Sequence, residues 1–256
     1  MNLVRAGLLM LAMSIAGASL AQPDTAREAF NRGITAGAAG GYGKAIGYFS
    51  EALRLDPAFA RAWYNRGLAY QHIGQNDRAL KDYSEAIRLE PGYAAAYANR
   101  GSIYHHLEQH ERAIKDYNEA IRLDPNQASA YANRGLSYIR LGQHGRAAAD
   151  LGEAIRLDPR DADSHDSLAW LLATSRATEL RDGKRAVEFA ARAVELTQFK
   201  EPAYLDTLAA AYARMGDFSS AIKWQLRALS DPQFAKNKEA QERLQLYRAS
   251  RPFPPE

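Results

Sequence analysis

Apolar and small residues recur at helical spacing through residues 60–93, in two stripes that a polar turn separates. The first stripe has the four- and three-residue spacing that places side chains on one helix face, and contains Trp63, Gly67 and Tyr70. A Gly-Gln-Asn segment at residues 74–76 interrupts the pattern. A second stripe then ends before Pro91, and contains Ala79, Tyr83, Ala86 and Ile87. The segment is predicted to form a helical hairpin.

This pattern returns with a period of 34 residues. The string Asn-Arg-Gly begins at Asn31, Asn65, Asn99 and Asn133. The string Glu-Ala-(Leu/Ile)-Arg-Leu begins at Glu51, Glu85, Glu119 and Glu153, and an acid and a proline follow each copy. One hairpin cannot cover both faces of its own apolar core, so the hairpins are predicted to stack into a solenoid.

The repeated residue types resemble those of the tetratricopeptide repeat (TPR) family. That family has a large residue, a Gly or Ala and a Tyr in the first helix, and a small-aromatic-small-Pro series in the second. Three units match, through Trp63, Gly67, Tyr70, Ala79, Tyr83, Ala86 and Pro91; Tyr97, Gly101, Tyr104, Ala113, Tyr117, Ala120 and Pro125; and, with Leu151 in the second aromatic place, Tyr131, Gly135, Tyr138, Ala147, Ala154 and Pro159. The resemblance implies an all-α fold, a right-handed α-solenoid of stacked antiparallel helix hairpins.

The period divides the chain into units of unequal quality. Well-matched repeats are expected at 60–93, 94–127 and 128–161. A weaker first repeat covers 26–59, where Ala29 and Ala36 occupy places in which aromatic residues are expected. Degenerate hairpins are expected at 162–200, with about five residues inserted around 176–182, and at 202–232. Residues 233–256 are predicted to form an amphipathic capping helix and a loose, extended tail.

The first 21 residues have the pattern of a signal peptide. Arg5 supplies the positive charge, residues 6–18 are almost entirely apolar or small, and Ser19-Leu20-Ala21 ends in a small-x-small cleavage motif. Cleavage is expected after Ala21, which predicts a periplasmic protein without stable membrane insertion. The alternatives are an uncleaved membrane anchor and a buried helix, although the apolar run is shorter than the roughly 20 residues that span a bilayer.

Composition and charge exclude several classes of protein. With 46% hydrophobic and 25% charged residues, the chain can bury a large core and is not expected to be disordered. The 33 basic and 30 acidic residues become 32 and 30 without Arg5, a surplus too small to indicate a nucleic-acid partner. The absence of cysteine excludes disulfides, thiolate metal sites and cysteine nucleophiles.

Motifs for catalysis or metal binding are incomplete. His110-Glu111 begins a zinc-protease pattern, but Ile114 occupies the place of its second histidine. Gly43-Lys44 resembles part of a phosphate loop, but Ala38 and Ala45 replace the required Gly and Ser or Thr. The histidines at 105, 106, 110 and 144 are interpreted as solvated turn and groove residues, with weak metal binding as the alternative. No enzymatic activity, cofactor or metal is expected.

The repeated asparagines are the most informative polar positions. Asparagine in a helix interior costs about 0.6 kcal/mol relative to alanine, so four copies forgo roughly 2 kcal/mol. The TPR resemblance implies that this position faces a concave groove, where an amide can pair with the backbone of an extended peptide. The predicted groove contains Asn31, Asn65, Asn99 and Asn133, together with Arg61, Tyr64, His72, His106 and Arg140, which would tune selectivity. The alternative is that each asparagine bonds to the neighbouring repeat or to water, and that duplication copied it.

A second repeated set of polar residues is interpreted as structural. Arginines at 66, 100 and 134 recur with aspartates at 82, 116 and 150, which an antiparallel hairpin would bring together as salt bridges. No cluster of basic groove residues like that of TPR proteins that clamp chaperone carboxylate tails is found. Binding of heat-shock-protein tails is therefore not expected.

Two functions follow from these observations. The first is a non-enzymatic adaptor that binds an extended peptide segment or a helix of a partner protein in its concave groove, in the cell envelope. The second is a structural or regulatory subunit that docks onto a larger envelope complex through its convex face or its C-terminal units.

Overall fold

The computed structural model describes residues 25–254, and the predicted leader at residues 1–21 lies outside this range. The described residues form helices and no strands. Five first helices alternate with five second helices. The first helices are α1 (Ala26–Ala38), α3 (Ala60–His72), α5 (Ala94–His106), α7 (Ala128–Arg140) and α9 (Ala162–Thr174). The second helices are α2 (Tyr42–Leu55), α4 (Asn76–Leu89), α6 (His110–Leu123), α8 (His144–Leu157) and α10 (Gly183–Leu196).

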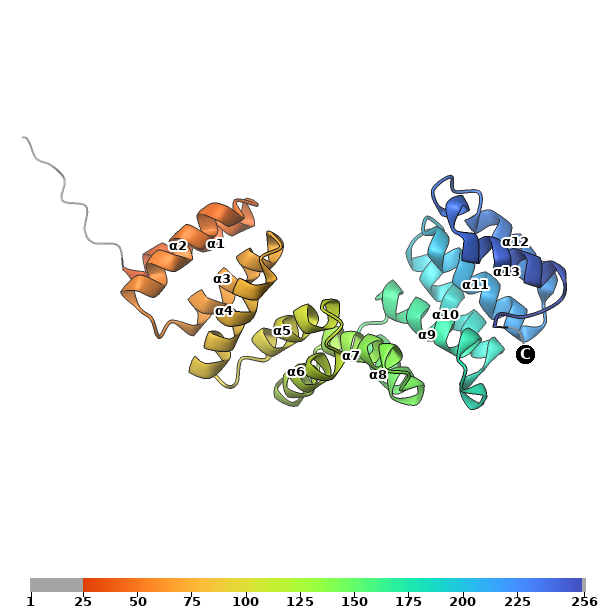
Figure 1. Cartoon of the computed structure of the whole chain (residues 1–256), viewed down its shortest axis with the longest axis horizontal. Coiled ribbons are helices and arrows are strands. Elements are labelled where there is room, and N and C mark those ends of the chain that lie inside the picture. The colour runs from red at the N-terminus through yellow and green to blue at the C-terminus, as the bar shows by residue number, and fades with distance from the viewer. Residues whose placement is uncertain (1–24, 255–256) are drawn as a thin grey trace, which may run out of the picture.

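Each first helix packs against the second helix of its own hairpin, and each second helix packs against the next first helix. The hairpins therefore follow one another along the long axis of the molecule as an α-solenoid (Figure 1). Among the helices of residues 25–254, none combines the length and the apolarity that crossing a membrane requires.

Glycines in the first helices let large side chains of the second helices pack closely. A Cβ atom on Gly67 would lie 2.8 Å from Tyr83 Cε1, and a Cβ atom on Gly101 would lie 3.0 Å from Tyr117 Cε1. Both tyrosines are buried. Because the first helix carries no side chain there, the ring of the second helix fills the space between the two backbones.

The predicted arginine–aspartate pairs are confirmed, and they also join neighbouring hairpins. Arg100 donates to both carboxylate oxygens of Asp116 at 2.7 and 2.8 Å, and through Nη1 to Ser84 Oγ of the preceding hairpin at 3.0 Å. The same arrangement connects Arg66 with Asp82 and Ser50, and Arg134 with Asp150 and Asn118. Each guanidinium therefore holds one hairpin together and fixes it to the one before.

The register changes after α9. Helix α10 begins at Gly183, five residues later than a 34-residue step from the start of α8 at His144 would place it. The intervening loop contains a short 3₁₀ helix, η1 (Thr178–Leu180). An insertion of this length in this loop agrees with the sequence expectation.

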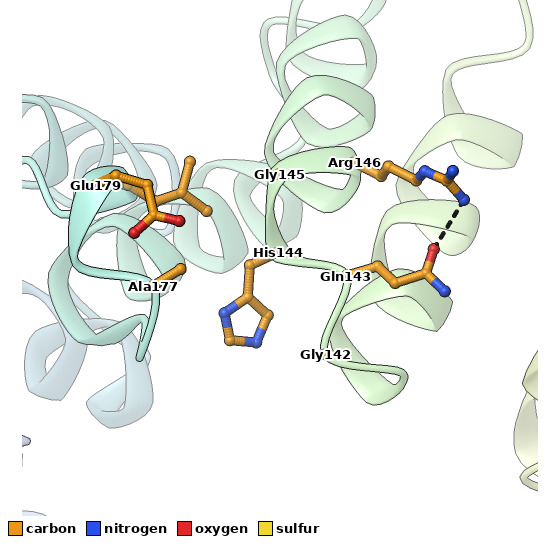
Figure 2. A pocket seen from close by; sticks show the side chains of 8 residues that line it. Gly142, Gln143, His144, Gly145, Arg146, Ala177 and Glu179 are labelled. Atoms are coloured by element: carbon orange, nitrogen blue, oxygen red, sulfur yellow. Dashed lines mark hydrogen bonds between the residues drawn. The ribbon is translucent and has the colours of Figure 1, made fainter.

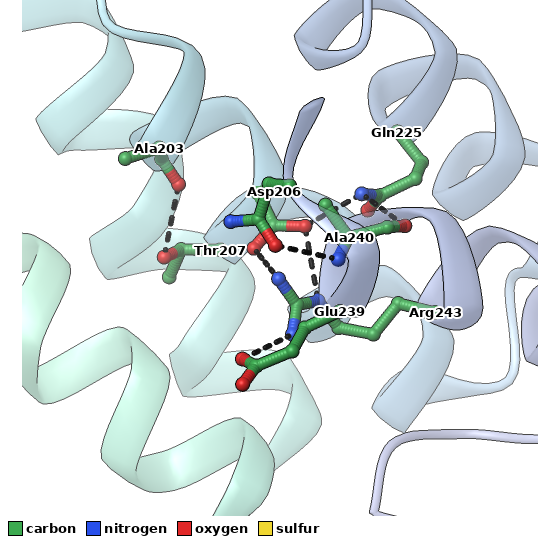
Figure 3. Close-up of polar contacts among 8 residues, drawn as sticks. Ala203, Asp206, Thr207, Gln225, Glu239, Ala240 and Arg243 are labelled. Atoms are coloured by element: carbon green, nitrogen blue, oxygen red, sulfur yellow. Dashed lines mark hydrogen bonds and ion pairs between the residues drawn. The ribbon is translucent and has the colours of Figure 1, made fainter. Parts of the chain in front are cut away.

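The C-terminal end of the solenoid is the C-terminal cap, defined as α11 (Pro202–Met215), α12 (Phe218–Ala228) and α13 (Lys238–Arg248), with η2 (Phe234–Lys236) before α13. A buried polar network fixes α13 to the hairpin (Figure 3). Arg243 Nη2 donates to Asp206 Oδ2 at 2.7 Å, and Gln225 Nε2 donates to Asp206 Oδ1 at 2.6 Å and to the Ala240 carbonyl at 3.0 Å. The network therefore connects all three helices of the cap.

The segment after α13 differs from the loose tail that its prolines suggest. Arg214 Nη2 donates to the main-chain carbonyls of Phe253 and Pro254 at 3.1 and 3.2 Å. The ring of Phe253 also lies 6.0 Å from the ring of Trp170. These contacts hold the last described residues against α9 and α11.

Candidate functional site

The first helices together form one continuous surface, here called the first-helix surface. First helices of successive hairpins contact one another, as seen for α1 with α3, α5 with α7, and α9 with α11, whereas contacts between successive second helices are sparser. Closer packing on one side bends a stack of hairpins toward that side. The first-helix surface is therefore the concave one, and it contains the repeated asparagines.

The N-terminal cavity lies between α1 and α3 and has a volume of about 290 Å³. Helix α3 contributes Asn65, Leu68 and His72, and α1 contributes mainly small and apolar residues, among them Ile34. The His72 ring stacks on the Tyr42 ring with centroids 4.3 Å apart. Apart from Asn65 and His72, the lining is apolar or glycine, namely Gly33, Ile34, Gly37, Ala38, Tyr42, Ala45, Phe49, Leu68 and Ala69.

The C-terminal cavity lies between α7 and α9 and has a volume of about 480 Å³. Asn133 and Leu136 line it, and they are two 34-residue periods beyond Asn65 and Leu68 of the N-terminal cavity. The opposite wall is polar and acidic, with Asp158, Asp161, Asp163, Ser164 and Ser167. The same face of the solenoid therefore has two cavities built around equivalent asparagines but with different chemistry.

The three aspartates of the C-terminal cavity form no ion pair within residues 25–254. Asp158 accepts the backbone N–H of Arg160 at 3.0 Å, Asp161 accepts the hydroxyl of Ser164, and Asp163 accepts the hydroxyl of Tyr204. All of these donors are neutral, so the cavity wall keeps its negative charge. Sequence reasoning missed this wall because the aspartates come near Asn133 only through the packing of α9 on α8, the second helix of the preceding hairpin.

The four asparagines differ in their own hydrogen bonds. Asn99 Nδ2 donates to the hydroxyl of Tyr64 in the preceding hairpin at 2.9 Å, and Asn65 Nδ2 donates to the Arg61 carbonyl at 2.7 Å. Burial raises the pKa of Tyr64, and the bond from Asn99 offsets part of this rise. Each of these bonds uses one N–H, and an amide has a second N–H and a carbonyl oxygen. The side chains of Asn31 and Asn133 make no hydrogen bond to residues 25–254.

The remaining residues of the predicted groove are spread along the first helices. The Arg61 guanidinium lies 5.5 Å from the ring centroid of Phe30, near the N-terminal end. His106 and Arg140 are exposed at the ends of α5 and α7. Beside His106, His105 Nδ1 lies 2.8 Å from Ser137 Oγ, which connects two first helices. In the part of the chain that the structure describes, no three His, Cys, Asp or Glu side chains are arranged to share a metal ion.

A half-buried carboxyl group lies close to the acidic wall. Asp166 of α9 is desolvated by burial, and with the nearby charges of Asp163 and Asp206 this raises its pKa to about 7, although a hydrogen bond with Thr207 acts in the opposite direction. A carboxyl with a raised pKa stabilises the fold below its unfolded pKa, and that contribution is lost as pH rises through the folded pKa. The contribution of Asp166 to the free energy of unfolding is therefore less favourable at pH 8 than at pH 4.

The substitution Asp166→Asn is expected to remove this pH dependence. The variant should be more stable than the parent at pH 8 by on the order of 1–3 kcal/mol, because no charge is then forced into the buried site. At pH 4 the two proteins should unfold alike. Urea titrations at both pH values measure the difference, and an equal offset at both would contradict the raised pKa.

Comparison with protein-family models identifies the repeats. Models described as tetratricopeptide repeat match residues 60–93, 83–115 and 128–161, and one described as TPR repeat matches residues 38–74 and 101–142. The chain belongs to the TPR family. A comparison with curated protein sequences gives no significant match.

Solved TPR structures share the fold. PilF from Pseudomonas aeruginosa aligns with a TM-score of 0.71 at 18% identity, over 85% of this chain and 95% of that chain. MamA from Desulfovibrio magneticus RS-1 aligns with a TM-score of 0.61 at 22% identity, over 70% and 99%. YrrB, described as a TPR protein with an unusual peptide-binding site, aligns with a TM-score of 0.64 at 19% identity, over 76% and 96%. The TPR fold makes the chain a protein–protein interaction scaffold.

Proposed function

We propose that this TPR protein is a non-enzymatic adaptor that holds an extended segment of a partner protein along its first-helix surface, in the cell envelope. One observation carries the proposal. Asn65 and Asn133, at equivalent positions of two repeats, each line a cavity on the concave face. A side-chain amide suits a peptide unit of any sequence, because it offers both a donor and an acceptor.

The spacing of the first helices suits an extended chain. Packed helices lie about 8–10 Å apart, and an extended chain advances about 3.3 Å per residue, so one first helix meets about every third residue. The two cavities are separated by three such steps, or roughly 24–30 Å. A segment of about eight residues would reach from one cavity to the other.

The two cavities favour different side chains. The apolar lining of the N-terminal cavity suits an aliphatic or aromatic residue, whose burial there would supply binding free energy. The unpaired aspartates of the C-terminal cavity suit a lysine or arginine, because opposite charges make the two surfaces complementary. The preferred segment therefore has an apolar residue near one end and a basic residue near the other.

The cell-envelope location rests on the leader at residues 1–21. Cleavage after Ala21 would release the TPR array into the periplasm. The peptide-binding site named for YrrB supports peptide binding as a use of this fold, although the likeness at 19% identity extends only to the fold.

An array of ten-residue peptides, probed with the parent protein and with substituted variants, tests the proposal. Asn133→Ala is the sharpest single change, because the Asn133 side chain makes no hydrogen bond within residues 25–254. We expect this substitution to lower the affinity for the selected peptides about three- to tenfold, which corresponds to the loss of one or two hydrogen bonds. The triple variant Asn65→Ala, Asn99→Ala, Asn133→Ala should lose binding altogether.

Substitutions on second helices are the matched control. Lys81→Ala and Lys115→Ala change exposed residues of α4 and α6, and they should leave peptide binding unchanged. Equal binding by the parent and the triple variant would show that the asparagines are structural and would remove the basis of the proposal.

A docking subunit is the second candidate function, and one surface feature favours it. Phe199 and Leu226 are exposed by 39% and 46% on the C-terminal units, and the Phe199 ring stacks on Trp224 with centroids 6.0 Å apart. If this surface docks onto a larger complex, Phe199→Ala with Leu226→Ala should reduce recovery of the complex, whereas Asn133→Ala should not. The opposite result would favour the adaptor.

A further inference from the structure

The C-terminal tail, defined as residues 251–254, contacts the C-terminal units through both its main chain and its side chains. Two of its main-chain carbonyls, those of Phe253 and Pro254, accept hydrogen bonds from Arg214 at 3.1 and 3.2 Å. The Phe253 ring lies 6.0 Å from the Trp170 ring, and the Arg243 guanidinium lies 5.5 Å from the centroid of the former and 5.3 Å from that of the latter. The contacts therefore come from three different helices, α9, α11 and α13.

The surface beneath the tail continues the first-helix surface. Trp170 is one 34-residue period beyond Leu136 and three beyond Leu68, and each of those leucines lines a cavity. Helices α7 and α9 have the same length and begin one period apart, so Leu136 and Trp170 occupy the same place in their helices. The tail therefore covers the C-terminal end of the surface to which the asparagine row also belongs.

The guanidinium that holds the tail is itself fixed in place. Arg214 Nε donates to the carbonyl of Ala173 at 2.8 Å, across the contact between α9 and α11. Arg243 is also fixed, by its buried ion pair with Asp206. The two arginines and Trp170 thus form a preorganised site, which needs little ordering when a segment binds.

The chemistry of this site suits a proline-flanked aromatic residue. Proline has no N–H, so a segment with prolines beside its aromatic residue presents carbonyl oxygens that few internal donors occupy and that Arg214 can bind. Aromatic side chains of a protein surface commonly receive segments of this kind. An arginine over an aromatic face adds a favourable cation–π contact. The tail sequence, Arg-Pro-Phe-Pro, supplies the aromatic ring and the flanking prolines, and Arg243 and Arg214 of the site supply the cation and the donor.

The tail remains only half-buried, since the side chains of Pro252, Phe253 and Pro254 keep part of their surface in solvent. A short segment with partial burial is held largely because it is tethered, which gives it a high effective concentration. A free segment of the same chemistry, at sufficient concentration, would displace it.

We propose that Trp170, Arg214 and Arg243 form a second binding site, the tail site, for a proline-flanked aromatic segment of a partner protein. The tail of this chain occupies the site as an internal competitor. The apparent affinity for a partner segment equals the affinity of the open site multiplied by the fraction of molecules whose site is open. The tail therefore raises the concentration of partner segment that binding requires. The tail site goes beyond the adaptor function of the asparagine row and does not depend on it.

Fluorescence anisotropy with a labelled peptide of sequence RPFPPE tests the tail site. Phe253→Ala in the full chain weakens the internal competitor, and we expect this variant to bind the peptide about tenfold or more tightly than the parent. A variant that ends at Ser250 should behave in the same way. A peptide in which alanine replaces phenylalanine, RPAPPE, should bind neither to Phe253→Ala nor to the variant that ends at Ser250.

Trp170→Ala, placed in the Phe253→Ala background, should abolish binding of RPFPPE, with circular dichroism melts to show that the variants remain folded. Equal binding by the parent and Phe253→Ala, or no loss on Trp170→Ala, would overturn the proposal. Asn133→Ala should leave RPFPPE binding unchanged. Failure of the tail site and failure of the asparagine row are therefore separate results.

Discussion

Replacing Asp206 with alanine is expected to destabilise the C-terminal cap by about 3–5 kcal/mol. The side chains of Arg243 and Asp206 are only 5% and 7% exposed, and the carboxylate accepts from Arg243 and from Gln225 (Figure 3). Its removal leaves the buried guanidinium with only the exposed carboxylate of Glu239, 3.8 Å away, as a counter-charge, and the Gln225 amide with only the Ala240 carbonyl as an acceptor. Urea unfolding followed by tryptophan fluorescence would report the change, because Trp170 and Trp224 lie near this network.

Two further variants separate this effect from a general loss of stability. Glu85→Ala removes an exposed ion pair with Arg88 and should change the unfolding free energy by less than about 1 kcal/mol. The double variant Asp206→Leu, Arg243→Met should recover much of the loss, because replacing both members of a buried pair with apolar residues removes the uncompensated charge. If Asp206→Ala unfolded at the same urea concentration as Glu85→Ala, the result would show that the polar network contributes little to the stability of the C-terminal cap.

The destabilisation should remain local. In a stack of repeats each unit contacts only its neighbours, so stability is approximately a sum over units and their interfaces. Hydrogen exchange should therefore accelerate in α11, α12 and α13 of Asp206→Ala, and should stay close to the parent in α3 and α4.

The period of 34 residues is the feature that made the fold predictable. The first helices begin at Ala26, Ala60, Ala94, Ala128 and Ala162, one period apart. Every second helix up to α8 ends two residues before a proline, since a residue that precedes proline is driven out of the helical conformation. A repeated pattern of this kind fixes helix positions because each copy must make the same contacts with its neighbours.

Contacts within a hairpin were also predictable, whereas contacts between hairpins were not. The pairing of Arg100 with Asp116 follows from the antiparallel arrangement of two helices, but the bond from Arg100 to Ser84 depends on how successive hairpins are rotated. That rotation is set by side-chain packing along the whole stack, which a single repeat does not encode.

The degenerate C-terminal units show the same limit more strongly. Arg243 has the sequence context of an exposed charge on an amphipathic helix, yet it is buried against Asp206, which lies 37 positions earlier. The acidic wall of the C-terminal cavity is likewise formed by a loop and the start of α9. Where no repeat supplies a template, long-range polar contacts leave no recognisable pattern in the sequence.

A further cavity, which sequence reasoning did not anticipate, depends on the five-residue insertion. The loop after α9 brings Ala177 and Glu179 opposite the start of α8, where His144 and Arg146 lie (Figure 2). His144 Nδ1 lies 2.7 Å from Ser175 Oγ, so the histidine connects the fourth hairpin with the fifth. His105 likewise contacts Ser137 of the next hairpin, although from a different position of its repeat, and both contacts indicate a structural role for these histidines.

The asparagine row divides into two pairs on structural grounds. Asn99 donates to Tyr64 of the preceding repeat and Asn65 donates to the Arg61 carbonyl of its own helix, whereas the side chains of Asn31 and Asn133 make no hydrogen bond within residues 25–254. Asn133 combines an amide without a hydrogen bond to residues 25–254 with a place on the wall of the C-terminal cavity. It is therefore the position at which ligand binding and structural support are most clearly distinguished.

Protection of a single cysteine from labelling tests most directly whether a partner segment lies on the first-helix surface. The chain has no cysteine, so one substitution gives one reactive thiol. Ser129→Cys places it at an exposed position on the wall of the C-terminal cavity, and Ser219→Cys places a matched control on the second helix α12. With a saturating array-selected peptide, maleimide labelling at position 129 should slow about tenfold or more and labelling at position 219 should not change. Unchanged labelling at position 129 with the peptide bound would contradict the account.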